Sequence, residues 1–210
     1  MTNQLSEQKK RAIEIFKMRG FAFVHVPKTA GYSITRELLD GNITEHATAT
    51  ELRNMIGKEE WSKLFAFAFV RDPATRFISA FWYLKAGGMN QRDSKWANTN
   101  LSGVQSAEKF INILSENNTS LGEWVHFKPQ YQFVSDSMTG AFLVNYIGRY
   151  ENLKEDYRKI LSNIAREAQP LSRHNQANYS EKIRNWKMKS RHQLFEMYQR
   201  DYEIFGYPHP

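Results

Sequence analysis

FAFVHVPKTAGYSI (residues 21–34) and FAFAFVRDPATRFISAF (residues 65–81) are the two stretches that decide the fold. In each, an apolar run of strand length is followed by a turn and then by apolar residues at helical spacing. Continuous apolar runs of this length are typical of buried parallel strands. Strands that alternate with helices predict an α/β fold, with three α/β/α layers around a central parallel sheet.

The rest of the chain continues this alternation. The helix after the first stretch is expected to begin near Ser33, a residue type that often caps helices, and to end at Gly41. Thr48 or Thr50 could cap the short helix that comes next. The other predicted elements are helices over residues 5–19, 51–57, 105–118, 151–168 and 181–201, a third strand over residues 142–150, and loops over residues 87–103 and 170–180.

The composition indicates one globular domain over residues 1–210. The chain has 210 residues, of which 41% are hydrophobic, enough for a substantial core. It has no cysteine, which excludes disulfides and thiolate chemistry. No window approaches the ~18 consecutive apolar residues of a membrane span, and the N-terminal residues lack the apolar segment of a signal peptide. We therefore expect a soluble, cytoplasmic protein.

The basic charge is concentrated in the last third of the chain. The formal net charge is +7, and residues 158–200 contain ten Lys or Arg against three Asp or Glu. Such a face can bind nucleic acid, an acidic glycan or a nucleotide phosphate, although most charged faces are simply solvated. The charge alone does not choose among these partners.

The first stretch has the residue types of an anion-binding turn. Lys28, Thr29, Gly31 and Ser33 lie between the strand and the helix, where unpaired backbone N–H groups and a partial positive charge attract anions. The pattern is not G-x-x-x-x-G-K-[ST], because the lysine precedes the glycine. A magnesium-bound triphosphate is therefore not the expected ligand.

The second stretch adds another cation and hydroxyl. Arg71 follows the second strand immediately, and Ser79 lies two helical turns further along. A second phosphate, remote from the first anion, would explain this pair. Because ligands of parallel sheets bind beyond the carboxyl ends of the strands, the two stretches together predict a site for a doubly anionic ligand.

These motifs resemble those of the sulfotransferases that use 3′-phosphoadenosine 5′-phosphosulfate (PAPS). PKTAGYS is similar to the family's 5′-phosphosulfate loop, and VRDPATRFISAF to its 3′-phosphate motif. GRYENLKEDY and DYEIFGY resemble segments of the carbohydrate-type branch, which includes the heparan sulfate 2-O-sulfotransferases. The resemblance implies a P-loop-kinase-like fold and transfer of a sulfuryl group from PAPS to a hydroxyl, with release of adenosine 3′,5′-bisphosphate. It implies a carbohydrate or small polar acceptor, no metal and no nucleic acid.

The resemblance also implies roles for individual residues. Lys28 would neutralise the charge that develops on the bridging oxygen as the sulfuryl group leaves. Arg71 and Ser79 would hold the 3′-phosphate and so distinguish PAPS from ATP. The family often has Thr or Ser where this chain has Tyr32, so that contact would be through the backbone. The residues expected to surround the 5′ end are Thr29, Ala30, Gly31, Tyr32 and Ser33.

An alcohol acceptor needs a proton acceptor within hydrogen-bond reach, and histidine suits this task at neutral pH. His46 lies in a short loop where the 2-O-sulfotransferase type carries its catalytic histidine, so we expect it to be the base. His126, in HFKPQ, is the alternative, and His25 is expected to be structural. Arg173, His174 and Asn175 lie where a basic loop often closes over the nucleotide in this family, and a solvated turn is the alternative for this segment.

Two other functions remain open from the sequence. A nucleotide or small-molecule kinase of similar architecture would need magnesium and a carboxylate to hold it, and the only candidate is the generic Asp72. A non-enzymatic binder of an anionic polymer would use the basic last third, and its affinity would fall steeply with salt.

Overall fold

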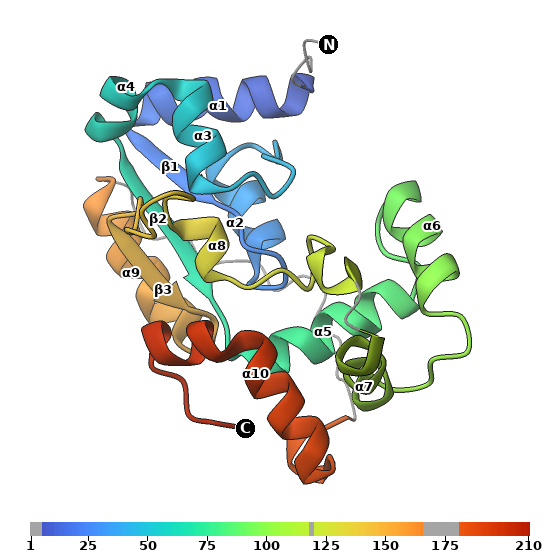
Figure 1. Ribbon diagram of the computed structural model, residues 1–210. Coiled ribbons are helices and arrows are strands. Elements are labelled where there is room, and N and C mark those ends of the chain that lie inside the picture. The colour runs from blue at the N-terminus through green and yellow to red at the C-terminus, as the bar shows by residue number, and fades with distance from the viewer. Residues whose placement is uncertain (1–5, 118–119, 166–180) are drawn as a thin grey trace. The chain divides into compact units, whose positions relative to one another are not determined.

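The structure of the protein is a computed structural model that describes residues 6–117, 120–165 and 181–210 (Figure 1). The chain divides into two units, one formed by residues 1–71 and 130–175 and the other by residues 72–129 and 176–210. The single sulfotransferase domain expected over residues 1–210 stays a prediction. The predicted loop over residues 170–180, with Arg173 and His174, lies outside the described residues.

A parallel sheet of three strands organises the first unit. Strands β1 (Phe21–Val24), β2 (Phe65–Val70) and β3 (Tyr146–Arg149) lie in the order β1-β2-β3. Both neighbouring pairs are parallel. The predicted mixed α/β class with a parallel sheet is therefore confirmed, and the three carboxyl ends lie at one edge of the sheet.

Aromatic side chains fill the middle of this sheet. Phe21 pairs with Phe65, and Phe23 pairs with Phe67, whose ring centroid lies 5.2 Å away. Phe21, Phe23 and Phe67 are fully buried. Because burial of one such side chain contributes about 1.5–3 kcal/mol, these rings hold the strands in register.

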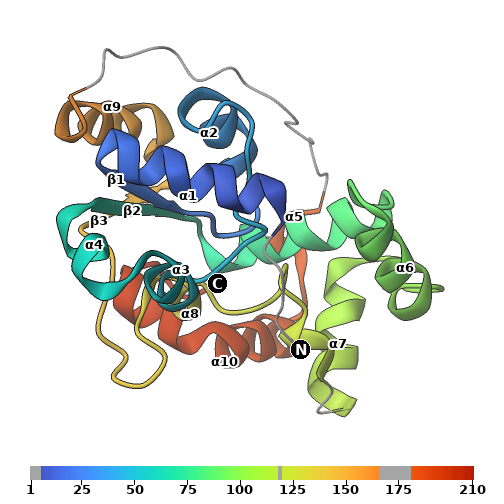
Figure 2. The same cartoon turned by 90° about the horizontal axis from the view of Figure 1, so that it is seen from above.

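Helices of the first unit lie on both sides of this sheet. In Figure 2, α1, α2 and α9 lie on one side, and α3 and α8 lie on the other. Ser6 caps the first helix, and Gly20 ends it with a φ of 71°. Helix α4 was not predicted. The helices of this unit are α1 (Glu7–Arg19), α2 (Gly31–Leu38), α3 (Ala49–Ile56), α4 (Lys58–Lys63), α8 (Tyr131–Val134) and α9 (Leu153–Asn163), with a 3-10 turn η2 (Tyr150–Asn152).

The third strand is shorter than predicted. It begins at Tyr146 rather than at residue 142. Phe142 instead forms an isolated antiparallel bridge with Ser135. The Asn145 side chain accepts a hydrogen bond from the Ala66 N–H at 2.8 Å, and the Asn145 N–H donates to the Ala66 carbonyl at 2.7 Å. These two bonds join the chain to β2 just before β3 begins.

Aromatic residues also form the core of the second unit. The Phe77 ring lies 5.2 Å from Phe127 and 5.9 Å from Phe110, centroid to centroid. Arg76 is fully buried and donates to the carbonyls of His126 and Lys128. The helices of this unit are α5 (Pro73–Lys85), α6 (Gln91–Asn100), α7 (Ala107–Asn117) and α10 (Met188–Phe205), with 3-10 turns η1 (Ser120–Glu123) and η3 (Ile183–Asn185).

The long loop predicted over residues 87–103 contains helix α6, so that prediction was wrong. The Asn90 side chain caps the helix by accepting a hydrogen bond from the Asp93 N–H at 2.8 Å. Asp93 in turn accepts from the Tyr83 hydroxyl at 2.7 Å, which ties α6 to α5. In the part of the chain that the structure describes, no helix is both long and apolar enough to cross a membrane.

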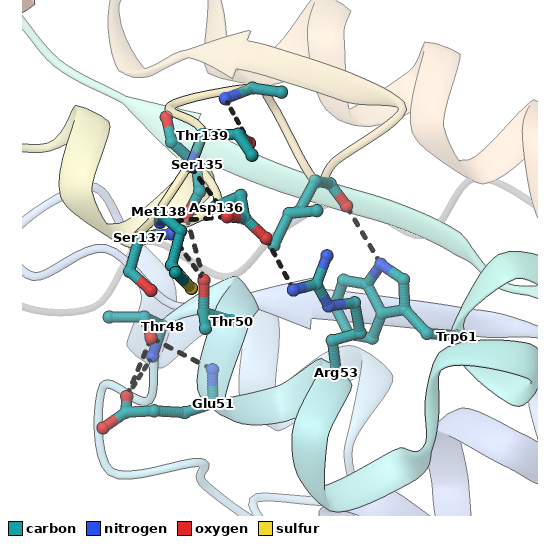
Figure 3. A network of polar contacts seen from close by, with 12 residues as sticks. Thr48, Thr50, Glu51, Arg53, Trp61, Ser135, Asp136, Ser137, Met138 and Thr139 are labelled. Carbon is teal, nitrogen blue, oxygen red and sulfur yellow. Dashed lines mark hydrogen bonds and ion pairs between the residues drawn. The ribbon is translucent and has the colours of Figure 1, made fainter.

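A polar network fixes α3 to the segment before β3 (Figure 3). The Thr50 hydroxyl donates to the Ser135 carbonyl and accepts from the Ser137 N–H. Arg53 donates to an Asp136 oxygen at 2.6 Å. Thr48 and Glu51 form a capping box at the start of the helix, which confirms Thr48 as the cap. The network therefore anchors the end of the loop that carries His46.

Asp136 should make the stability of the protein depend on acid pH. Backbone N–H groups of Thr139 and Met138, together with Arg53, lower the pKa of Asp136 to about 2. A carboxyl whose folded pKa lies below its unfolded pKa stabilises the protein above the unfolded value, and the contribution is lost as the pH falls through the folded value. Asp136→Asn should therefore lower the melting temperature at pH 6, and its difference from wild type should shrink as the pH approaches 2.

Glu60→Gln provides the control for this titration. Glu60 pairs with Lys63 on the surface, and exposed pairs contribute little to stability. Scanning calorimetry of the three proteins between pH 6 and pH 2.5 measures the difference. A gap between Asp136→Asn and wild type that stays constant over this range would contradict the assignment.

Candidate functional site

The turn between β1 and α2 has an unusual backbone. Lys28 and Ala30 both have a φ of 69°, in the left-handed region that residues with a Cβ seldom adopt. This conformation costs roughly 1–2 kcal/mol for each such residue. Strained backbone of this kind tends to occur at binding and catalytic sites. The residues that the sequence predicted to surround an anion therefore form a tight, strained turn.

The Thr29 side chain forms a hydrogen bond within this turn. Its side chain is fully buried, and its hydroxyl donates to the Val26 carbonyl at 2.8 Å. A hydroxyl has one hydrogen, so in this arrangement it is not donated to an anion. The Thr29 side chain thus holds the loop in shape, and any contact with an anion would come from its backbone N–H.

Helix α2 begins earlier than predicted. Its N-cap residue is Ala30, and its first residue is Gly31, so the expected start near Ser33 was wrong. The Ser33 N–H donates to the Ala30 carbonyl at 3.0 Å, which brings Ser33 inside the helix, where it is 6% exposed. The first turn has no acidic residue, so no carboxylate there compensates the partial positive charge of the N-terminus.

Arg71 is held at the end of β2 by residues that the sequence reasoning did not identify. The Gln130 side chain is fully buried, accepts from the Arg71 N–H at 2.9 Å and donates to the Arg71 carbonyl at 2.8 Å. Tyr150 is the first residue after β3, and the Arg71 guanidinium lies 4.3 Å from the centre of its ring. Gln130 therefore fixes the backbone of Arg71, and Tyr150 supports its guanidinium.

The same arginine joins the two predicted motifs. A guanidinium nitrogen of Arg71 lies 3.4 Å from the Lys28 carbonyl and donates to it. The segments after all three strands thus meet at one place in the first unit, through the Lys28 carbonyl, the Arg71 guanidinium and the Tyr150 ring. Convergence of two cationic residues at the carboxyl edge of a parallel sheet is the arrangement expected of an anion site.

His46 also lies in the first unit, beside the turn. Its Nδ1 lies 3.1 Å from the carbonyl oxygen of His25. The His25 and His46 rings are 4.3 Å apart, centroid to centroid. Both histidines are partly exposed. A partly exposed imidazole can exchange protons with a ligand, as a general base must.

The second unit contains the other two predicted site residues. Ser79 lies in α5 and is 5% exposed. His126 is 4% exposed, and its Nε2 lies 3.2 Å from an Asp93 oxygen. Burial opposes ionisation of Asp93, but hydrogen bonds and charge from His126, with hydrogen bonds from Tyr83 and Asn90, lower the pKa of the carboxyl. His126 is thus part of a buried polar cluster.

The structure brings most of the predicted site residues together in the first unit. The side chain of Tyr32 is 41% exposed. In the described ranges no group of three or more His, Cys, Asp or Glu residues could hold a metal ion. The predicted residues found in the first unit are Lys28, Thr29, Ala30, Gly31, Tyr32, Ser33, His46 and Arg71.

Comparison with known proteins agrees with the motifs. The family model described as the sulfotransferase family matches residues 12–208. An uncharacterized protein of Archaeoglobus fulgidus is 28% identical over 114 residues, which cover 54% of this chain and 78% of that protein. No solved structure matches the chain. The family match spans both sequence motifs.

The Thr29 hydroxyl should contribute to the stability of the fold rather than to the binding of an anion. Thr29→Val keeps the shape but leaves the buried Val26 carbonyl without its donor, which typically costs about 1–3 kcal/mol. Thr29→Ser keeps the hydroxyl, so it should lose much less. Urea denaturation of both variants measures the difference, and equal losses in the two would show that the hydrogen bond is not what holds the turn.

Proposed function

The chain belongs to the sulfotransferase family, and we propose that it transfers a sulfuryl group from PAPS to a hydroxyl of a carbohydrate or another small polar acceptor. The observation that carries this proposal is the contact between the two motifs. The Arg71 guanidinium donates to the carbonyl of Lys28 in the strained turn before α2. A donor with anions at both its 5′ and 3′ ends suits two such cationic groups.

The 5′ end of the donor is proposed to bind the turn. The backbone N–H groups of residues 29–32, the Ser33 hydroxyl and the ammonium of Lys28 would surround the phosphosulfate, since helix N-termini favour anions; the Ser33 N–H is already bonded to the Ala30 carbonyl. Lys28 would stabilise the negative charge that develops on the bridging oxygen. Arg71 is proposed to contact the 3′-phosphate, and Ser79 stays a prediction for the same group.

The reaction is proposed as an in-line displacement at sulfur. The acceptor oxygen forms a bond to the sulfur while the bond between sulfur and the bridging phosphate oxygen breaks. The hydroxyl proton passes to His46, and the electron pair of the broken bond stays on the 5′-phosphate of adenosine 3′,5′-bisphosphate. Positioning and charge stabilisation would supply most of the acceleration. No metal takes part in this scheme.

His46 is preferred over His126 as the base because of their surroundings. His46 is partly exposed and lies beside the β1–α2 turn. His126 is 4% exposed and its Nε2 is engaged with Asp93. A buried imidazole with a nitrogen bonded to a carboxylate is less accessible to an acceptor hydroxyl, which a general base must reach.

The branch of the family, the three-layer architecture and the single domain are also proposals. GRYENLKEDY and DYEIFGY support the carbohydrate-type branch. Helices on both sides of a parallel sheet support a three-layer, P-loop-kinase-like architecture. The family match over residues 12–208 supports one sulfotransferase domain.

Adenosine 3′,5′-bisphosphate should stabilise the protein much more than ATP with magnesium. A ligand at 100 times its Kd adds about 2.7 kcal/mol, which corresponds to a rise in melting temperature of roughly 5–10 °C for a chain of this size. Lys28→Ala should remove most of this rise, whereas Lys63→Ala, at a surface pair, should retain it. Differential scanning fluorimetry measures the shifts. Equal shifts with both nucleotides, or none, would contradict the proposed donor.

His46→Ala should lower turnover without weakening the nucleotide complex. Loss of a general base costs roughly 10²–10⁴-fold in rate. His126→Ala should instead lower the melting temperature, because it removes a buried partner of Asp93. Transfer of ³⁵S from PAPS to a panel of desulfated glycosaminoglycans, simple glycosides, phenols and lipids measures turnover. Full activity of His46→Ala would place the base elsewhere.

A further inference from the structure

Gly31 is a glycine because a histidine ring occupies the space where its side chain would be. A Cβ built on Gly31 would lie 1.8 Å from Nε2 and 1.9 Å from Cδ2 of His25. The φ of Gly31 is not in the left-handed region, so its conformation does not require glycine. The His25 imidazole therefore rests directly on the first residue of α2.

The core holds the His25 ring in this place. Because side chains alternate along a strand, His25 continues the face of β1 that carries Phe23. The rings of Phe23 and His25 are stacked with their centroids 5.7 Å apart and an angle of 20° between their planes. Phe23 is stacked in turn on Phe67, at 5.2 Å. A column of packed rings thus leads from the buried sheet to His25.

His46 contacts the same residue through two groups. Its ring centroid lies 4.3 Å from that of His25, with the planes 56° apart. Its Nδ1 lies 3.1 Å from the His25 carbonyl oxygen. Because a carbonyl oxygen can only accept, Nδ1 must carry the hydrogen, and the lone pair of the neutral ring is then on Nε2. Residue 25 therefore sets both the tautomer and the orientation of His46.

The loop around His46 is strained in a way that supports this role. Glu45 and His46 have φ angles of 54° and 59°, two consecutive left-handed residues that are not glycine. The Ala47 N–H donates to the Thr44 carbonyl at 3.0 Å, and Lys9 pairs with Glu45 at 3.0 Å. Such a conformation persists only where surrounding contacts hold it.

We propose that His25 is a positioning residue for His46: its ring separates His46 from the first turn of α2, and its carbonyl keeps the lone pair of His46 on Nε2. This inference rests on the proposed function, in which His46 accepts the proton of the acceptor hydroxyl. It replaces the expectation that His25 is only structural. The His25 side chain acts by filling the space between His46 and α2. This role requires a ring of this shape but does not require a second base.

A double-mutant cycle tests the position of the ring without any assay of activity. In wild type, Gly31→Ala should lower the melting temperature, since the new methyl group would overlap the His25 ring. In the His25→Ala background the same substitution should be neutral or stabilising, because alanine is favoured over glycine in a helix. The effects of two substitutions at one contact should thus be strongly non-additive. Equal losses in both backgrounds would overturn the proposed contact.

Nitrogen NMR of the imidazoles tests the tautomer of His46. Spectra of ¹⁵N-labelled wild type at a pH where the ring is neutral should show Nδ1–H for His46, with His46→Ala to assign the signals. His25→Phe, which keeps a ring and the carbonyl, should preserve that tautomer. His25→Ala also keeps the carbonyl but removes the ring that holds His46 against it, so it should give a mixture of the two tautomers. The Nε2–H form in wild type would overturn the proposal.

Measurements of turnover then show whether His25 positions His46 or takes part in the reaction itself. With ³⁵S transfer from PAPS, His25→Ala should lower kcat by about tenfold or more while the KM for PAPS stays within about threefold. His25→Phe should restore most of the lost kcat, and the exposed His192→Ala should match wild type. A His25→Phe variant as slow as His25→Ala would show that the His25 nitrogens react directly, and would overturn the positioning role.

The three measurements separate this inference from the proposed function. If wild type transfers no sulfur to any acceptor, the proposed function fails, while the double-mutant cycle and the NMR spectra still decide the arrangement of the two histidines. If wild type is active and His25→Ala does not change kcat, the proposed function stands and the role of His25 is refuted.

Discussion

The sharp turn from β1 into α2 is the constraint on which the site depends. The chain leaves a buried strand and starts a helix at Gly31, with Lys28 and Ala30 both at a φ of 69°. The buried strand, the internal hydrogen bond of Thr29 and the His25 ring over Gly31 hold this conformation together. Because the turn is tight, the helix N-terminus and the lysine are presented at one end of the sheet.

The remaining strand ends complete this arrangement. Gln130 fixes the backbone of Arg71 after β2, and Tyr150 after β3 supports its guanidinium. The polar network around α3 anchors the far end of the loop that carries His46. Arg71 and His46 are therefore held by residues that are not proposed to touch the ligand, as preorganised sites require.

The sequence predicted those parts of the structure that depend on local patterns. The apolar runs predicted β1 and β2, and Thr48 was one of the two residues predicted as possible caps of the next helix. The start of α2 and the contact of His25 with Gly31 depend on packing between separate segments, which local propensity does not contain. The sequence did contain two signals of this contact. His25 lies two residues after Phe23, so the two side chains point to the same face of the strand. Gly31 lies at a helix start, where the backbone does not require a glycine. The helix at residues 91–100 was missed because its polar sequence has little apolar periodicity.

A crystal structure of the protein with adenosine 3′,5′-bisphosphate tests the central claim most directly. The account predicts that the 5′-phosphate accepts hydrogen bonds from backbone N–H groups of the β1–α2 turn and from Lys28, and that the 3′-phosphate contacts Arg71. The His46 Nδ1 should remain bonded to the His25 carbonyl. A nucleotide bound away from this turn, or bound with its 3′-phosphate on the α2 N-terminus, would contradict it.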